Sequence, residues 1–196
     1  MRAQPLLLAL NLLALPLAAQ ERERVLEGFA ARASRGGIGL PAAAALRDTS
    51  IALYPEVHFY SGDLPLEHGG TLRLYGAVDS AGQLYLLDSP ASFRLLHARH
   101  FRAVLDSAAA GEIAVLAARF GGQLPDAFAV QQRAILPMRA AGRGEERRLI
   151  GWEVHLTVRS TLGTSRLHYW IMLPTGTPEL MSRECDDWCK TTIIEP

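Results

Sequence analysis

Lysine and asparagine are nearly absent from this sequence, since Lys190 is its only lysine and Asn11 its only asparagine. No serine or threonine lies two residues after Asn11, so the chain has no N-glycosylation sequon. The 20 basic and 20 acidic side chains cancel, so no excess of positive charge predicts nucleic acid or an acidic membrane as a partner. Beyond residue 20, no apolar run reaches the roughly 20 residues that a membrane-spanning helix needs.

The sequence also lacks the short motifs that usually identify enzymes. It contains no Walker-A loop, no G-x-G-x-x-G after a strand, no H-E-x-x-H, no EF-hand loop and no G-x-S-x-G elbow. A Ser-His-Asp triad stays open, because its members need not be close in sequence. We therefore predict no cofactor and no metal, and we favour a protein that is not an enzyme.

The first residues look like a secretory signal peptide. Arg2 gives a positive start, residues 6–17 are mostly apolar, and Ala18 and Ala19 are small enough for cleavage near Ala19. An uncleaved N-terminal anchor is the alternative. The predicted location is secreted or periplasmic, and the predicted organisation is a signal peptide over residues 1–19, an N-terminal helical segment over 20–48 and an α+β domain over 49–196.

Cys185 and Cys189 are the only cysteines. In an exported protein this pair predicts a disulfide. The flanking residues 180–184 and 190–194 have the composition of strands, which would set the two thiols opposite each other across a three-residue hairpin loop. The alternative is a soft-metal or redox site.

Residues 70–89 show the clearest local pattern, a β-hairpin. Leu74 and Val78 alternate with more polar residues, as in a half-buried strand, and residues 79–82 have the composition of a turn. Residues 84–87 run back. We expect the apolar side of this hairpin to be covered by the helical segment that follows it.

Four helices are predicted, of which one is short. Residues 21–35 are amphipathic, residues 42–47 follow a proline, Ser89 and Pro90 begin a helix, and Asp106 caps another over 108–120. In the helix after Ser89, one apolar stripe holds Phe93, Leu96, Phe101 and Val104. Residues 61–70 are expected to form a loop.

The last third of the chain alternates like strands, over residues 152–158 and 167–173, after another strand over 130–138. We expect a four-residue loop that pairs Val158 with Tyr169, because a two-residue loop at 162–163 would oppose two arginines. His155, His168 and Trp170 then lie on the polar face of the sheet.

Two histidines, His97 and His100, lie three residues apart on the apolar side of the predicted helix, so both imidazoles can reach one ligand. With His155 and His168 they are the candidate ligand-binding residues. The simpler interpretation is that His97 and His100 are partly buried and hydrogen-bonded to the protein itself.

Short motifs resemble the C-terminal domain of TonB-type energy transducers. They are Gly70-Thr71, the turn over residues 78–82, the Leu-Asp-x-Ala-Ala start at residues 105–109 and Arg119-Phe120. The chain has no proline-rich spacer, and its residues from 149 onward have no counterpart in that family. The resemblance implies a small α+β domain that binds an extended partner segment at a sheet edge.

We predict an α+β protein with a mostly antiparallel sheet, helices packed on one face, an N-terminal amphipathic helix and a C-terminal disulfide hairpin. The leading hypothesis is an exported, non-catalytic interaction module that binds an extended segment, for instance of another envelope protein, at the edge near Pro55 or at the final hairpin. The alternative is a pocket domain of the cystatin or nuclear-transport-factor type, with His97, His100 and His155 lining a small-ligand or acid–base site. A hydrolase with an unrecognised triad is the third hypothesis.

Overall fold

The structure, a computed structural model, describes residues 17–35, 46–65, 71–121, 128–141, 147–160 and 163–185. The elements follow in the order α1 (Leu17–Arg35), β1 (Leu46–Ser50), β2 (Val57–Pro65), β3 (Thr71–Asp79), β4 (Leu84–Leu86), α2 (Pro90–His100), α3 (Ser107–Phe120), β5 (Phe128–Ala141), β6 (Arg147–Ser160), β7 (Gly163–Met172) and β8 (Thr177–Cys185). The strands form two four-stranded antiparallel sheets, β1-β2-β3-β4 and β5-β6-β7-β8. The predicted α+β class and antiparallel pairing are confirmed.

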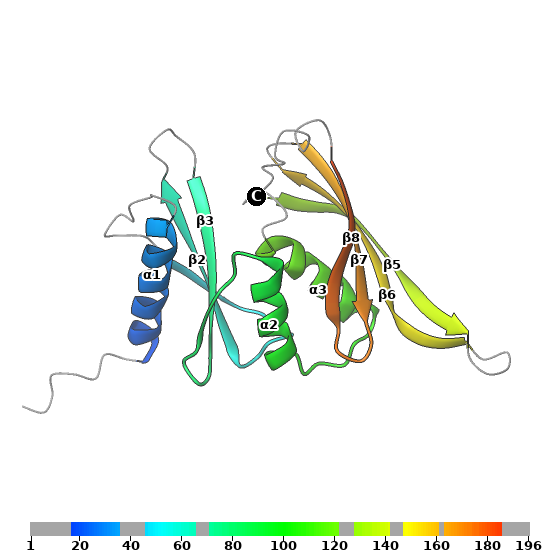
Figure 1. Cartoon of the computed structure of the whole chain (residues 1–196), viewed down its shortest axis with the longest axis horizontal. Helices are drawn as coiled ribbons and strands as arrows, with labels where there is room; N and C mark the ends of the chain where they lie inside the picture. Colours follow the sequence, from blue (N-terminus) through cyan, green and yellow to red (C-terminus); the bar gives the residue numbers. More distant parts are fainter. Residues whose placement is uncertain are drawn as a thin grey trace, which may run out of the picture.

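The elements stack in four layers (Figure 1). Helix α1 lies on the outer side of the first sheet, α2 and α3 lie between the two sheets, and the second sheet closes the far side. The prediction of one sheet covered on one face is therefore wrong. Nine residues of helix α3 are buried. So many can be buried because a sheet lies on either side of the helix. That helix separates the strands before it from the strands after it.

Helix α1 confirms the predicted amphipathic helix. Its buried residues Val25 and Phe29 pack with Leu46, Tyr60 and Val78 of the first sheet. The burial of Tyr60 and its hydrogen bond to Glu21, at 2.9 Å, raise the pKa of this phenol to about 12. Residues 1–16 lie outside the described residues, so the signal peptide remains a prediction; no helix of the described part is long and apolar enough to span a membrane.

The β3–β4 hairpin forms as predicted, but a different element covers its apolar side. Val78 pairs with Leu84, and Gly82 takes a φ of 77°, which a residue without Cβ adopts at little cost. Val78 faces α1, whereas Ala77 on the opposite side joins the core with α2 and α3. Both faces of the hairpin are therefore buried.

The first sheet is larger than predicted. Residues 61–65 continue β2 rather than beginning a loop, and Leu46 and Arg47 belong to β1 rather than to a short helix. The remainder of the predicted 42–47 helix lies outside the described residues. Pro55 precedes β2, and β2 is an interior strand between β1 and β3, so the edge predicted near Pro55 is wrong.

Helix α2 begins as predicted, with Ser89 accepting a hydrogen bond from the Ser92 amide and Pro90 in the first turn. Phe93 and Leu96 are buried. The helix ends at His100, however, and Val104 is 86% exposed, so the predicted apolar stripe stops one turn early.

Helix α3 begins at the predicted cap, where the Asp106 carboxylate accepts from the Ala109 amide at 2.8 Å. Its alanine-rich sequence lets the backbone approach the second sheet closely. At Gly111, a Cβ atom would lie 2.8 Å from the Cδ1 of Ile135 on β5. Gly111 thus serves packing and does not divide the helix.

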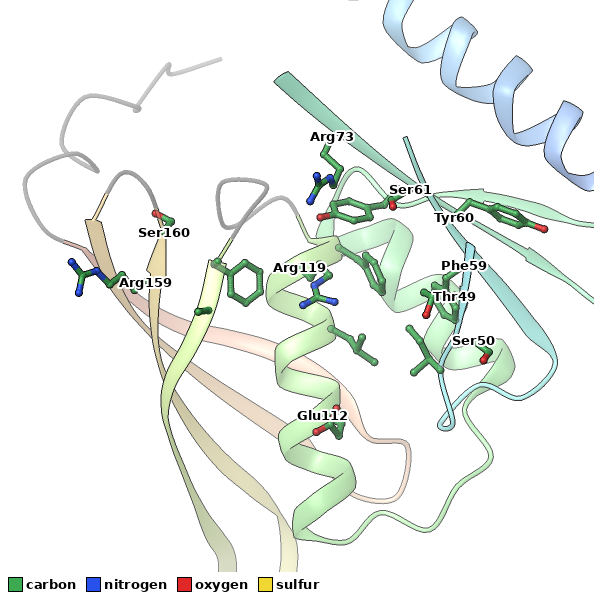
Figure 2. A pocket seen from close by; sticks show the side chains of 16 residues that line it. Thr49, Ser50, Phe59, Tyr60, Ser61, Arg73, Glu112, Arg119, Arg159 and Ser160 are labelled. Atoms are coloured by element: carbon green, nitrogen blue, oxygen red, sulfur yellow. The ribbon is translucent and has the colours of Figure 1, made fainter. Parts of the chain in front are cut away.

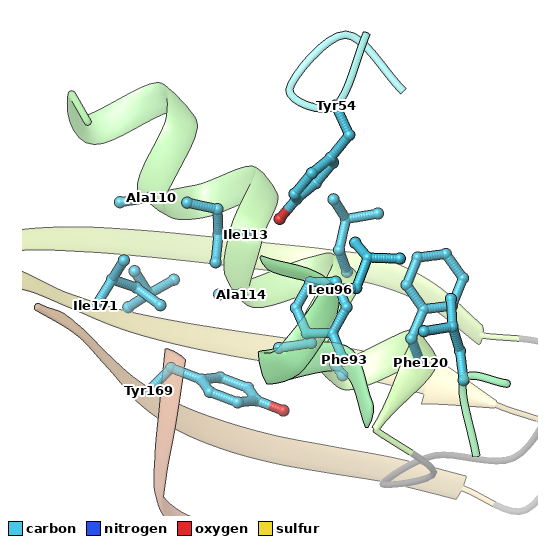
Figure 3. Packing of buried hydrophobic residues seen from close by; sticks show 14 of the residues in the cluster. Tyr54, Phe93, Leu96, Ala110, Ile113, Ala114, Phe120, Tyr169 and Ile171 are labelled. Atoms are coloured by element: carbon cyan, nitrogen blue, oxygen red, sulfur yellow. The ribbon is translucent and has the colours of Figure 1, made fainter. Parts of the chain in front are cut away.

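The main core lies around α2 and α3 (Figure 3). Tyr54 points from the loop before β2 toward the helices, and Phe59 stacks on Phe120 with ring centroids 5.4 Å apart. The second sheet contributes the buried residues Val154, Leu156, Val158, Leu167, Tyr169 and Ile171. Residues from both sheets therefore belong to one cluster.

The predicted register of β6 and β7 is wrong, although the predicted strands are confirmed. Ser160 pairs with Gly163, so two residues connect the strands, and Val154 rather than Val158 lies opposite Tyr169. Arg166 lies opposite Thr157, which avoids the repulsive arginine pair in another way.

At the C-terminal end, β8 pairs with β7 and ends at Cys185. Cys189 and the predicted strand over 190–194 lie outside the described residues. The described structure therefore does not support the disulfide hairpin, which stays a prediction.

Candidate functional site

A cleft of about 840 Å³ opens between the two sheets, next to the C-terminal part of α3 (Figure 2). Its walls come from β1, β2 and β3 on one side and from the neighbouring ends of β5 and β6 on the other. The lining residues are Thr49, Ser50, Ile51, Phe59, Tyr60, Ser61, Arg73, Tyr75, Glu112, Leu116, Arg119, Phe120, Phe128, Ala129, Arg159 and Ser160.

Three arginines from three different elements line this cleft. Arg73 of β3 donates to both carboxylate oxygens of Asp63, at 2.5 and 3.0 Å. The hydrogen bonds from this guanidinium hold the pKa of Asp63 below its usual value, against the effect of partial burial. The charge of Arg73 is therefore already compensated.

The other two arginines are better placed for a ligand. Arg119 of α3 lies over the ring of Phe128, 5.5 Å from its centroid, and neither Arg119 nor Arg159 forms an ion pair within the described part of the chain. The acidic lining residue, Glu112, contacts Arg133 at 3.1 Å. The cleft is therefore net positive and attracts anionic groups.

Aromatic rings form the floor of the cleft. Phe120 stacks on Phe59 and meets Tyr75 edge-on, with centroids 5.3 Å apart. Phe128 adds a ring from the second sheet. The cleft thus combines an apolar base with guanidinium groups, a composition that suits a ligand with both apolar and acidic parts.

Two sheet edges border the cleft. β1 is the edge of the first sheet and β5 the edge of the second, and neither has a second neighbour among the described strands. Thr49 and Ser50 of β1 and Phe128 and Ala129 of β5 line the cleft. Such edges carry backbone N–H and C=O groups that can pair with an added strand.

The four candidate histidines do not converge on one cavity: His97 and His100 have separate partners, whereas His155 and His168 lie together elsewhere. His97 is fully buried, with Nδ1 2.7 Å from the Tyr54 hydroxyl and Nε2 2.8 Å from the Thr175 carbonyl. Burial lowers the pKa of His97, and the hydrogen bond to Thr175 opposes this only partly. His97 is a hydrogen-bonded core residue, which is the simpler of the two interpretations offered by the sequence.

His100 belongs to a network at the β3–β4 turn. Its Nε2 lies 3.1 Å from the Tyr85 hydroxyl and 3.3 Å from Asp79. Burial would raise the pKa of Asp79, but hydrogen bonds from Gln83, Tyr85 and Ala81, and the nearby His100, hold it below its usual value. This network fixes the turn. His97 and His100 contact different groups, so their ring nitrogens do not point to a common ligand site.

His155 and His168 do meet, on the outer face of the second sheet. They are directly opposed across β6 and β7, and their rings stack with centroids 4.4 Å apart. Glu153 joins them, with its Oε1 2.9 Å from Nε2 of His155 and 3.0 Å from Nε2 of His168. These three ligand atoms lie within 4.8 Å of one another, which is compatible with a metal ion.

The sequence did not identify Glu153 as a partner of these histidines, nor the arginines of the cleft. Glu153 lies two residues from His155 on the same face, so the alternation of β6 already placed both together. The correct β6–β7 register was the missing information. Arg73, Arg119 and Arg159 come from distant parts of the chain, and no local pattern joins them.

Comparisons of the chain with protein-family models, with curated proteins and with solved structures found no match. The resemblance to the energy-transducer domain remains a prediction from short motifs.

Proposed function

We propose that this protein is an exported, non-catalytic binding module that holds an extended acidic segment of a partner protein in the cleft between its two sheets. The observation that carries the proposal is the position of Arg119 and Arg159 in a cleft bordered by two strand edges. An extended segment would pair its backbone with one of these edges, while its side chains alternate between the arginines and the aromatic floor.

The composition of the lining favours binding over catalysis. No histidine or cysteine is among the described residues that line the cleft, so the most frequent general base and the most reactive nucleophile are missing there, and the lining carboxylate of Glu112 is paired with Arg133. The hydroxyls of Thr49, Ser50 and Ser61 can donate to or accept from a peptide backbone. Aromatic and arginine side chains together are also the residue types that dominate protein interfaces.

The β1 and β5 edges replace the edges named from the sequence. Register shifts follow both Val130 and Met138 of β5, but the distal part is less suited to pairing because Pro137 there also lacks an N–H. The first residues of β5, which border the cleft, are the better template. The predicted final hairpin lies only partly within the described residues.

An array of short peptides tests the proposal. In each peptide, acidic, basic or neutral residues would alternate with valine or phenylalanine, and binding would be measured by fluorescence anisotropy. We expect acidic peptides to bind and basic peptides not to bind. Added salt should weaken binding, because the arginines lie close to solvent.

The double variant Arg119→Gln/Arg159→Gln should weaken binding by roughly tenfold or more. Arg148→Gln is the matched control, since Arg148 is exposed on β6 at the far end from the cleft and should leave binding unchanged. Equal binding of acidic and basic peptides, or binding of small carboxylates without any binding of peptides, would reject the proposal. The latter result would favour the alternative of a small-ligand pocket.

A further inference from the structure

We propose that Glu153, His155 and His168 form a binding site for a divalent transition-metal ion of the zinc class on the outer face of the second sheet. This site lies on the opposite face of the sheet from α3 and does not depend on the partner-binding cleft. Two imidazole nitrogens and one carboxylate oxygen are a ligand set that zinc accepts readily, whereas Ca²⁺ and Mg²⁺ prefer oxygen ligands.

Metal binding would require the two imidazole rings to turn, because they stack with an interplanar angle of 12° and their Nε2 lone pairs, which lie in the ring planes, do not point at one ion in this arrangement. The oxygen–nitrogen distances need only small changes. In a tetrahedral site with bonds of about 2.0–2.2 Å, ligand atoms lie about 3.3–3.5 Å apart. The Glu153 oxygen lies 2.9 and 3.0 Å from the two nitrogens, so it would move outward by only a few tenths of an ångström. The ligands come from adjacent positions of paired strands, which fixes their backbones relative to one another.

Without a metal, the arrangement leaves one nitrogen poorly satisfied. Nε2 of His168 is itself buried and close to Glu153, yet the direction of this contact does not make it a hydrogen bond. A buried polar atom without a hydrogen bond is costly and needs an explanation such as an ion. A metal would accept the lone pairs of both imidazoles and neutralise the carboxylate between them.

The site is also accessible. A hollow of about 310 Å³ opens beside it, lined by His155, Leu156, Thr157, Arg166, Leu167, His168, Ser182 and Glu184. His155 and Glu153 keep 46% and 33% of their side-chain surface exposed, so an ion can reach them without unfolding. Three protein ligands leave a fourth tetrahedral position, which water or a further ligand can occupy, as in open zinc sites.

Calorimetric titration of the untagged, chelator-treated full chain with ZnCl₂ tests the proposal. We expect one Zn²⁺ per chain and no comparable heat with CaCl₂. His155→Gln and His168→Gln should each weaken binding by at least roughly tenfold, because even residues that merely support metal ligands contribute that much. His58→Gln is the matched control, because His58 also contacts a glutamate, Glu21 at 3.2 Å, but has no second histidine beside it.

Two further measurements keep the outcome decisive. Zinc binding should persist in the Cys185→Ser/Cys189→Ser variant, and its loss there would assign the ion to the thiols and overturn the proposal. In the unaltered chain, zinc should shift the imidazole NMR signals of His155 and His168 but not those of His97 or His58. No zinc uptake, or imidazole shifts only at other histidines, would equally overturn the proposal. Because this measurement uses the unaltered chain, it does not depend on whether a variant folds.

Discussion

The hydroxyl of Tyr54 lies 2.7 Å from Nδ1 of His97 in the centre of the protein. The other ring nitrogen of His97 lies 2.8 Å from the Thr175 carbonyl, which can only accept. Nε2 therefore carries the proton and donates to Thr175, and Nδ1 accepts from Tyr54. One neutral imidazole thus joins the loop before β2, helix α2 and the turn between β7 and β8, which belong to different layers of the fold.

Tyr54→Phe should lower the free energy of unfolding by about 1–3 kcal/mol, because it leaves Nδ1 of the buried His97 without a donor. Urea unfolding monitored by circular dichroism measures this change. Tyr169→Phe is the matched control: the Tyr169 hydroxyl is also buried but has no hydrogen-bond partner in the described structure, so its removal should be neutral or stabilising. Equal destabilisation by both variants would contradict the assigned hydrogen bond.

The protonation of His97 should make stability depend on pH. Burial places its pKa in the folded protein below the value of 6.5 expected in the unfolded chain. Between these two values the unfolded chain binds more protons, so stability is complete above pH 6.5 and falls as the pH decreases, by at most about 1.4 kcal/mol per pH unit. The lowered pKa values of Asp63 and Asp79 affect the free energy of unfolding only in a more acidic range.

Urea midpoints measured from about pH 7.5 down to about pH 5 test this dependence. In His97→Gln, whose amide can still donate to the Thr175 carbonyl, the decrease over this range should become shallower even though the variant is less stable at neutral pH. An unchanged slope in His97→Gln would show that other groups cause the decrease.

Local chemistry in the sequence predicted local structure well. The Asp79–Gly82 turn, the Ser89 cap with Pro90 and the Asp106 cap all lie where their side chains predict them. Each depends on contacts between residues only a few positions apart. The exposed Val104 shows the limit of this approach, since the helical period continued in the sequence after the helix itself had ended at His100.

The division into two sheets could not be predicted from strand patterns. Alternation shows that a strand has a buried face, but not which element covers it. The best indication was α3, whose Ala-rich sequence is apolar nearly all round and therefore suits a helix buried on both sides. The β3–β4 hairpin is likewise buried on both faces, since Val78 packs toward α1 and Ala77 toward α2 and α3.

The register of β6 and β7 explains why the candidate metal site was missed. The predicted pairing of Val158 with Tyr169 differs from the observed pairing by an even number of residues, so the polar face was predicted correctly. The predicted register, however, would put His155 opposite Met172 rather than His168. The side-chain period of two determines the face of a residue but not its neighbour on that face.

Phe29 should be the residue on which the docking of α1 mainly depends. Its ring lies against Gly62 and Gly76 on neighbouring strands, where an added Cβ atom would come within 3.1 Å of it. Phe29→Ala should cost about 3–5 kcal/mol, because it leaves a cavity that the sheet backbone cannot fill. Gly76→Val should lower the free energy of unfolding at the same contact by displacing the ring.

Glu27→Ala, on the exposed side of α1, is the control and should change the free energy of unfolding by less than about 0.5 kcal/mol in urea unfolding. Because α1 packs on one face of the first sheet, Phe29→Ala and Gly76→Val should also accelerate hydrogen exchange at β3 amides while those of β6 and β7 stay protected. Uniform acceleration in both sheets would show instead that α1 is needed for the entire fold.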